Sequence, residues 1–224
     1  MKKILFNLPE FLPSNKVLWR NTDYTFIVGM NGVGKTFLLN QMIAWSTHKN
    51  YSYAHYDSDT ALNIVDDLID STSDEDIIYI AKLIMDFSMD FKDDVFNWTK
   101  AANNHSVDQI GPIGEDATLL RKIFHRAGNG YLRMFTILCL GVQKKGDLDY
   151  YFLDLPEASL HILLARKILD ILMHDFNLTK FVITTHSPDI IEDKWSDENV
   201  ISMKCEFSDE AEKFEFDEEF HYKP

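Results

Sequence analysis

An eight-residue stretch near the N-terminus carries the residue types that bind phosphate groups. It fits the pattern G-x-x-x-x-G-K-[ST] at every fixed position and consists of Gly29, Met30, Asn31, Gly32, Val33, Gly34, Lys35 and Thr36. Glycines let backbone N–H groups curl around an anion, and a helix that starts at the loop adds the positive end of its dipole. We therefore expect Lys35 to reach the β- and γ-phosphates of a nucleotide and the Thr36 hydroxyl to ligate Mg²⁺.

The residues on either side of this loop supply the strand and the helix that such a motif requires. Residues 24–28 are a run of β-branched and aromatic residues, and residues 37–43 have the apolar spacing of a helix. The alternative is a chance glycine-rich turn before a helix. Because both flanks independently agree with the motif, the phosphate-binding interpretation is favoured.

Two later stretches end in polar residues that could act beside the loop. Residues 149–154 have the pattern of a buried strand that ends in Asp154, and a carboxylate at the tip of a central strand can hold Mg²⁺ through water. Residues 181–185 have the pattern of a second buried strand, which leads into His186. An imidazole there can donate to a phosphate oxygen; the alternative is a strand-end histidine with a structural hydrogen bond.

The remaining pattern predicts an α/β fold in one domain, residues 1–224, with a central and largely parallel sheet, an antiparallel β edge and a small helical subdomain. A helical insertion is expected at about residues 57–127, and Ser73 is a plausible N-cap within it. Alternating apolar residues near the C-terminus predict a closing β-hairpin around residues 208–212. Further strands are expected at residues 3–8, 16–20 and 51–56, and further helices at residues 115–126, 131–140 and 159–176.

Charge is distributed unevenly along the 224 residues, whose formal net charge is −14. Residues 57–94 carry a net charge of −10 and residues 197–219 a net charge of −8. We interpret both acidic blocks as solvated surface, with docking of a basic partner as the alternative. The overall charge disfavours nucleic-acid binding by the isolated chain, although a complex could still contact nucleic acid. A local basic face that includes Arg121, Lys122, Arg126 and Arg133 is compatible with this charge distribution.

Cysteine content and hydropathy bear on the compartment. The two cysteines, Cys139 and Cys205, form no metal-like cluster and suit a reducing interior. The sequence shows no signal-peptide pattern and no apolar run long enough to span a membrane. A cytoplasmic location without a membrane partner is therefore expected.

Three motifs together resemble the nucleotide-binding domain of ABC-type ATPases, on the RecF/SMC-like branch of bacterial and phage AAA-family ATPases. They are the phosphate loop GMNGVGKT, the stretch YYFLDLPEASLH and the stretch FVITTHSP, and they occur in the family's order. The resemblance implies a P-loop NTPase fold with ATP and Mg²⁺ as ligands. It also implies that Asp154 supports Mg²⁺, that His186 contacts the γ-phosphate, and that residues 159–161 lie in a loop at a subunit interface.

In this family ATP is bound between two domains, and a signature loop from the other subunit completes each site. The matching residues here are Gly128, Asn129 and Gly130, with Gly128 where the family has a serine. Backbone N–H groups at the following helix start could still bind phosphate. A plain loop into a buried helix is the alternative.

A second departure from the family concerns the catalytic carboxylate. Leu155 stands where the family has the glutamate that polarises water, and leucine cannot accept a proton. Glu157 is the nearest substitute, or else it is a second glutamate of the family pattern without a catalytic role. The family's Mg²⁺-contacting glutamine has no clear counterpart, although Asp57 or Asp59 could replace it.

These residues predict a Mg²⁺-dependent ATPase that sandwiches ATP in a homodimer and hydrolyses it slowly, with Asp154, Glu157 and His186 as its catalytic residues. The alternative is a non-hydrolysing ATP switch that recruits a separate effector protein. A third hypothesis is an interaction protein whose acidic blocks bind a basic surface. The intact loop, Asp154 and His186 argue against that third hypothesis.

Overall fold

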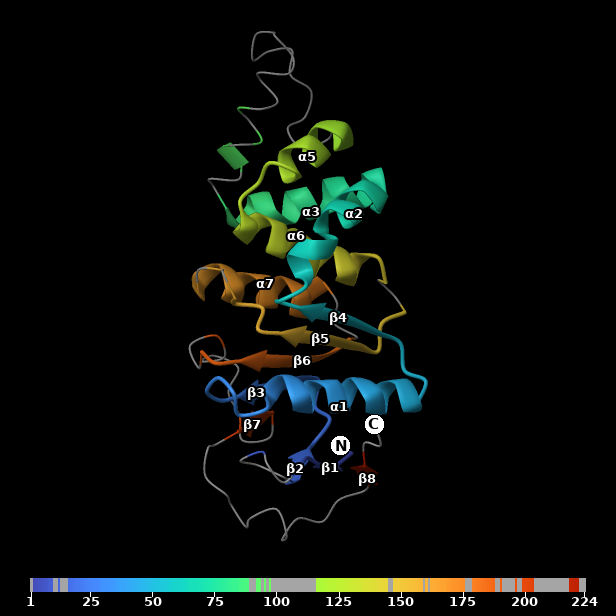
Figure 1. Cartoon of the computed structure of the whole chain (residues 1–224). Helices are drawn as coiled ribbons and strands as arrows, with labels where there is room; N and C mark the ends of the chain where they lie inside the picture. The colour runs from blue at the N-terminus through green and yellow to red at the C-terminus, as the bar shows by residue number, and fades with distance from the viewer. Residues whose placement is uncertain are drawn as a thin grey trace.

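The computed structural model describes residues 2–9, 12, 16–88, 92–93, 95, 97, 116–144, 147–158, 160, 162–175, 179–187, 190, 196, 199–203 and 218–221. Within these residues the chain forms two β-sheets, and helices cover both faces of the larger one (Figure 1). The α/β fold class predicted from the sequence is confirmed. Among the described helices, none is both long enough and apolar enough to cross a membrane.

The larger sheet is parallel throughout and has the strand order β4-β5-β6-β3-β7. Since all five strands run the same way, their carboxyl ends meet at one edge, which we call the carboxyl edge. This sheet contains the strand that leads into the phosphate loop, the strand that ends in Asp154 and the strand that leads into His186. The bounds are β3 (Tyr24–Val28), β4 (Tyr53–Asp57), β5 (Tyr150–Asp154), β6 (Lys180–Thr185) and β7 (Val200–Ser202).

The smaller sheet brings the two ends of the described chain together. It consists of β1 (Ile4–Asn7), β2 (Lys16–Trp19) and β8 (Glu218–His221), with β1 antiparallel to β2 and parallel to β8. Glu218 accepts hydrogen bonds from Lys2, Lys49 and Trp45, and these donors outweigh its desolvation and lower the pKa of its carboxyl to about 2.

Most of the predicted C-terminal hairpin lies outside the described residues, so the hairpin stays a prediction. Strand β7 pairs with β3 in the large sheet, whereas β8 pairs with β1 in the small one. Each strand finds a neighbour from the N-terminal part of the chain, so local alternation did not reveal its partner. The predicted turn at residues 208–212 lies outside the described residues.

Helix α1 (Lys35–His48) lies between the two sheets and joins their cores. Trp45 of α1 packs edge-on against Trp19 of β2, with ring centroids 5.1 Å apart, and against Tyr150 of β5. Both tryptophans are almost fully buried. This aromatic cluster fixes α1, and with it the helix end that receives the phosphate loop.

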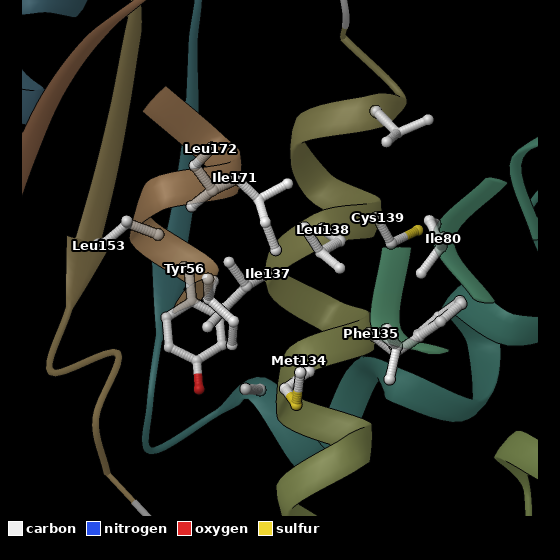
Figure 2. Close-up of a cluster of buried hydrophobic side chains, with 14 of the residues drawn as sticks. Tyr56, Ile80, Met134, Phe135, Ile137, Leu138, Cys139, Leu153, Ile171 and Leu172 are labelled. Atoms are coloured by element: carbon white, nitrogen blue, oxygen red, sulfur yellow. The ribbon is translucent and has the colours of Figure 1, made fainter. Parts of the chain in front are cut away.

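The opposite face of the large sheet carries a second core, which is mostly helical (Figure 2). Helices α6 (Asn129–Val142) and α7 (Ile162–Asp175) lie next to the sheet, and α2 (Ala61–Ser71), α3 (Asp74–Phe87) and α5 (Ala117–Phe124) lie beyond them (Figure 1). Met134, Ile137 and Leu138 of α6 are fully buried. As predicted, Ser73 caps α3 by accepting a hydrogen bond from the Asp76 N–H.

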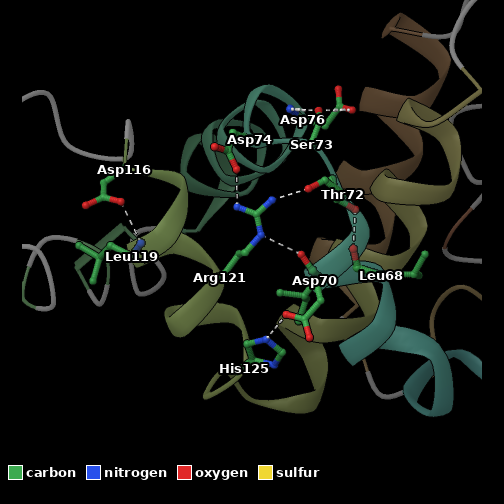
Figure 3. Close-up of polar contacts among 11 residues, drawn as sticks. Leu68, Asp70, Thr72, Ser73, Asp74, Asp76, Asp116, Leu119, Arg121 and His125 are labelled. Atoms are coloured by element: carbon green, nitrogen blue, oxygen red, sulfur yellow. Dashed lines mark hydrogen bonds and ion pairs between the residues drawn. The ribbon is translucent and has the colours of Figure 1, made fainter.

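Polar contacts hold the outer helices together and use up part of the predicted basic face (Figure 3). Arg121 of α5 donates to the carbonyls of Ile69 and Thr72 and pairs with Asp74, so it joins the end of α2 to the start of α3. The Arg133 guanidinium points instead to β4, where it donates to the Ser58 carbonyl. These two arginines are engaged with other parts of the fold at separate places, and the basic face stays a prediction.

Candidate functional site

The phosphate loop connects β3 to α1 at the carboxyl edge, in the arrangement that its sequence predicts. Gly34 has a φ of 94°, a left-handed conformation that favours glycine. Gly29 sits so close to the next strand that an added Cβ would lie 2.6 Å from the Met203 carbonyl oxygen. These constraints explain why glycine stands at these two positions of the motif.

Lys35 is folded back into the loop. Its Nζ donates to the carbonyls of Gly29 and Met30, each at 2.8 Å, and the residue is 6% exposed. Burial lowers the pKa of the Lys35 ammonium, and the charges of Asp154 and Glu157 act in the opposite direction. Three of the predicted site residues thus lie close enough to influence one another.

Asp154 ends β5 and faces the first turn of α1. Its Oδ2 accepts a hydrogen bond of 2.8 Å from Thr36 Oγ1, and its Oδ1 accepts one from Thr184 Oγ1 of β6. A hydroxyl and a carboxylate that face each other beside a phosphate loop fit Mg²⁺, which takes few protein oxygens and completes its shell with water and phosphate. Thr36 and Asp154 are therefore suited to hold the ion, as predicted for them.

Glu157 lies just beyond β5 and is 7% exposed. Its Oε1 accepts hydrogen bonds from Thr185 Oγ1 at 2.7 Å and from the His186 N–H at 3.1 Å. The Oε2 atom is buried and has no hydrogen-bond partner among the described residues. The His186 ring is 44% exposed, with its Nδ1 3.6 Å from Glu157 Oε1. Thus Glu157 and His186 form one unit at the end of β6.

Asp154 and Glu157 lie toward opposite faces of the sheet. Successive side chains of a strand alternate between faces. Val182 packs in the core beside α1 and Ile183 in the core beside α6 and α7, so Thr184 points to the α1 face and Thr185 to the α6 face. Each threonine holds the carboxylate on its own side.

Leu155 adopts an unusual backbone conformation between these two carboxylates. Its φ is 48°, and it precedes Pro156, which normally favours an extended conformation in the residue before it. The Leu155 N–H donates to Thr184 Oγ1 at 2.9 Å. A side chain in this region costs about 1–3 kcal/mol, and such strain is typical of functional sites.

The substitute for the family's glutamine remains a prediction. Asp57 ends β4 and is the register partner of Asp154, so it lies at the carboxyl edge. Its carboxylate accepts from the Asp59 N–H and from Thr60 Oγ1, which closes the turn into α2. Gln41 is buried within α1, and Gln143 follows α6 and donates to Thr72. Gln109 lies outside the described residues.

The predicted signature residues form the start of α6. Gly128 is the N-cap, and Asn129 and Gly130 form the first turn. An added Cβ on Gly128 would meet no atom within 4 Å, and Gly128 and Asn129 are both exposed. Two of the three predicted interface residues, Ser159 and His161, lie outside the described residues.

Sequence reasoning missed four side chains that organise this site: Thr184, Thr185, Tyr56 and Arg133. The two threonines end a buried strand, and a hydroxyl at a buried strand end is the signal that could have identified them. The partnership of Tyr56 with Arg133 joins positions 77 apart in the chain, and nothing in the local pattern marks it.

Comparison with known proteins gives only distant likenesses. No family model matches the sequence, and no curated protein matches it. Among solved structures, a dimeric bacterial ABC transporter cassette is similar, with 12% identity, a TM-score of 0.46, and coverage of 91% of this chain and 92% of that one. A nucleotide-free ATP-binding cassette from an ABC transporter is similar too, with 13% identity, a TM-score of 0.45, and coverage of 91% and 86%.

Proposed function

We propose that this chain is a Mg²⁺-dependent ATPase of the RecF/SMC-like ABC type. It binds ATP between two copies of itself and hydrolyses it slowly. The observation that carries the proposal is the meeting of Lys35, Thr36 and Asp154 at one edge of a parallel sheet. A cation, a hydroxyl and a carboxylate beside a glycine loop are the groups that bind a nucleotide triphosphate with its metal.

Each residue has a separate task in this proposal. Lys35 exchanges its hydrogen bonds to the loop carbonyls for phosphate oxygens, which are stronger partners because they are charged. Thr36 and Asp154 hold Mg²⁺, which neutralises charge that develops on the phosphates. The exposed His186 ring donates to the γ-phosphate, and Glu157 orients the attacking water.

Slow turnover follows from the chain's own residues. Leu155 offers no carboxylate next to Asp154, and Glu157 is the remaining candidate base. One of its oxygens is already engaged by Thr185 and His186, so only Oε2 is left to receive a water proton. We expect a base held in this way to be less effective than one that is free to reach the water.

The homodimer completes the site in this proposal. The chain has one phosphate loop and one candidate signature helix start, so two copies arranged head to tail form two full sites. Gly128, Asn129 and Gly130 then offer backbone N–H groups to the nucleotide bound by the other copy. Met30 of the phosphate loop is 73% exposed, and a second copy would cover such a side chain.

A non-hydrolysing ATP switch is the second candidate, and Leu155 is the observation that favours it. In that case ATP-induced association recruits a separate effector protein. Both candidates require the same phosphate loop and differ only in whether Glu157 activates water.

One experiment separates them: light scattering and phosphate release measured on the same wild-type sample. With Mg·ATP we expect a mass twice that of the monomer and slow phosphate release, and with EDTA neither. Association without phosphate release would select the switch. A chain that stays monomeric with Mg·ATP at high concentration would contradict the homodimer.

A further inference from the structure

A tyrosine and an arginine lie at the same edge of the large sheet as Glu157, without a role in the proposed function. Tyr56 of β4 is fully buried in the core beside α6. Arg133 of α6 donates through Nη1 to the Tyr56 hydroxyl at 3.2 Å and to the Ser58 carbonyl at 2.6 Å. Figure 2 shows the Tyr56 hydroxyl pointing away from Leu153, toward the Met134 end of α6.

The hydrogen-bond capacity of the tyrosine hydroxyl is only half used. It accepts from Arg133, so its own proton must point elsewhere. No acceptor for this proton is found among the described residues. A buried phenol with an unused donor loses the hydrogen bond that it would make in water, so its environment should provide an acceptor.

Glu157 Oε2 is an acceptor that lacks a donor, and it lies on the same side of the sheet. Thr185, which holds Glu157 Oε1, and Tyr56 both point to the α6 face. Burial is the main cause that raises the pKa of Tyr56; the negative charges of Asp57 and Glu157 raise it further, and Arg133 lowers it. The unpaired donor and the unpaired acceptor therefore lie on one face of the carboxyl edge, and no direct hydrogen bond joins them in the structure.

We propose that Tyr56, held by Arg133, is a positioning residue for Glu157, and that its hydroxyl donates to one buried water, which in turn donates to Oε2. Thr185 and the His186 N–H fix one oxygen of the carboxylate, and the water held by Tyr56 fixes the other, whose second lone pair stays available to the attacking water. The carboxylate then has one orientation. The catalytic consequence rests on the proposed function, but the hydrogen bond itself does not.

Tyr56→Phe tests this, because it removes the hydroxyl and keeps the buried ring. The matched control is Tyr151→Phe. Tyr151 is also fully buried and donates its hydroxyl to the Ile137 carbonyl, away from Glu157. Both variants lose one buried tyrosine hydroxyl, so they share the general cost to stability.

The readout is the infrared carboxylate band of Glu157 in protein with ¹³C-labelled glutamate, isolated as the difference between wild type and Glu157→Gln. We expect this band to shift in Tyr56→Phe and to stay in place in Tyr151→Phe. In the ATPase assay, Tyr56→Phe should lower kcat about tenfold and leave KM within about twofold. Arg133→Lys, which keeps the charge, should give a smaller shift in the same direction.

An unshifted band in Tyr56→Phe, or an equal shift in Tyr151→Phe, overturns the inference. Failure of the proposed function looks different, because it would remove ATP binding or turnover in the wild type and leave the infrared result unaffected. If Tyr56→Phe does not fold, the Arg133→Lys band decides the question alone, and an unchanged band there overturns the inference.

Discussion

Asp154 and Glu157 lie three positions apart at the same edge of the sheet, yet the chain treats them differently. Asp154 is bonded through both oxygens, to Thr36 and to Thr184, on the face that carries α1. Glu157 is bonded through Oε1 only, on the face that carries α6, and its Oε2 is buried without a described partner. Both oxygens of Asp154 therefore accept hydrogen bonds, whereas one oxygen of Glu157, Oε2, accepts none from the described residues.

This difference fits the two tasks that we propose for these carboxylates. A metal ligand gains from a fixed position, and outer-shell hydrogen bonds provide it. A residue that orients water needs a lone pair that the protein has not used. The hydrogen-bond pattern therefore supports the proposal that Asp154 holds Mg²⁺ and that Glu157 orients the attacking water.

The largest effect is expected from Glu157→Gln. The amide oxygen can still accept from Thr185 and the His186 N–H, so the fold should survive, while the charge and the proton acceptor are lost. If Glu157 orients the water, kcat falls about 10²–10⁴-fold and the affinity for Mg·ATP stays within about threefold. Single-turnover phosphate release and calorimetry on the same preparation measure the two quantities. Residual turnover at the wild-type rate would mean that Glu157 is structural.

A smaller effect, in the opposite direction, is expected from Leu155→Glu. This change places a carboxylate where the family pattern that the sequence resembles has one, and it should raise the rate at least about tenfold, a barrier change of about 1.4 kcal/mol. Leu155→Gln is the matched control, since it has the same length and the same backbone strain at φ 48° but no base. Steady-state phosphate release compares the pair. Equal rates in the two variants would show that position 155 does not face the water.

The sequence was most informative where function depends on adjacent residues. The phosphate loop, its flanking strand and helix, and the strands that end in Asp154 and Thr185 could all be predicted, because glycine spacing and apolar periodicity are local signals. The order of the strands was not predictable in the same way. It depends on which buried strands meet, and the C-terminal strands illustrate this by pairing with β3 and β1 instead of with each other.

Contacts between distant residues account for what could not be predicted at the site. Arg133 was considered as part of a surface, yet it reaches Tyr56 and Ser58 because α6 packs over the end of β4. The bonds from Thr184 to Asp154 and from Thr185 to Glu157 depend on β5 and β6 being neighbours. No spacing in a single sequence encodes such pairings.

The most direct test of the central claim is calorimetry of Mg·ATP binding to the wild type and to Lys35→Ala. Among the described residues, the Lys35 ammonium donates hydrogen bonds only to loop carbonyls, so its removal should leave the sheet and α1 intact, which circular dichroism can verify. We predict saturable binding by the wild type and a loss of affinity of at least about 100-fold in the variant, since charge-assisted bonds to phosphate are lost. Equal affinities in a folded variant, or no binding by the wild type, would contradict the assignment of residues 29–36 as the nucleotide-binding loop.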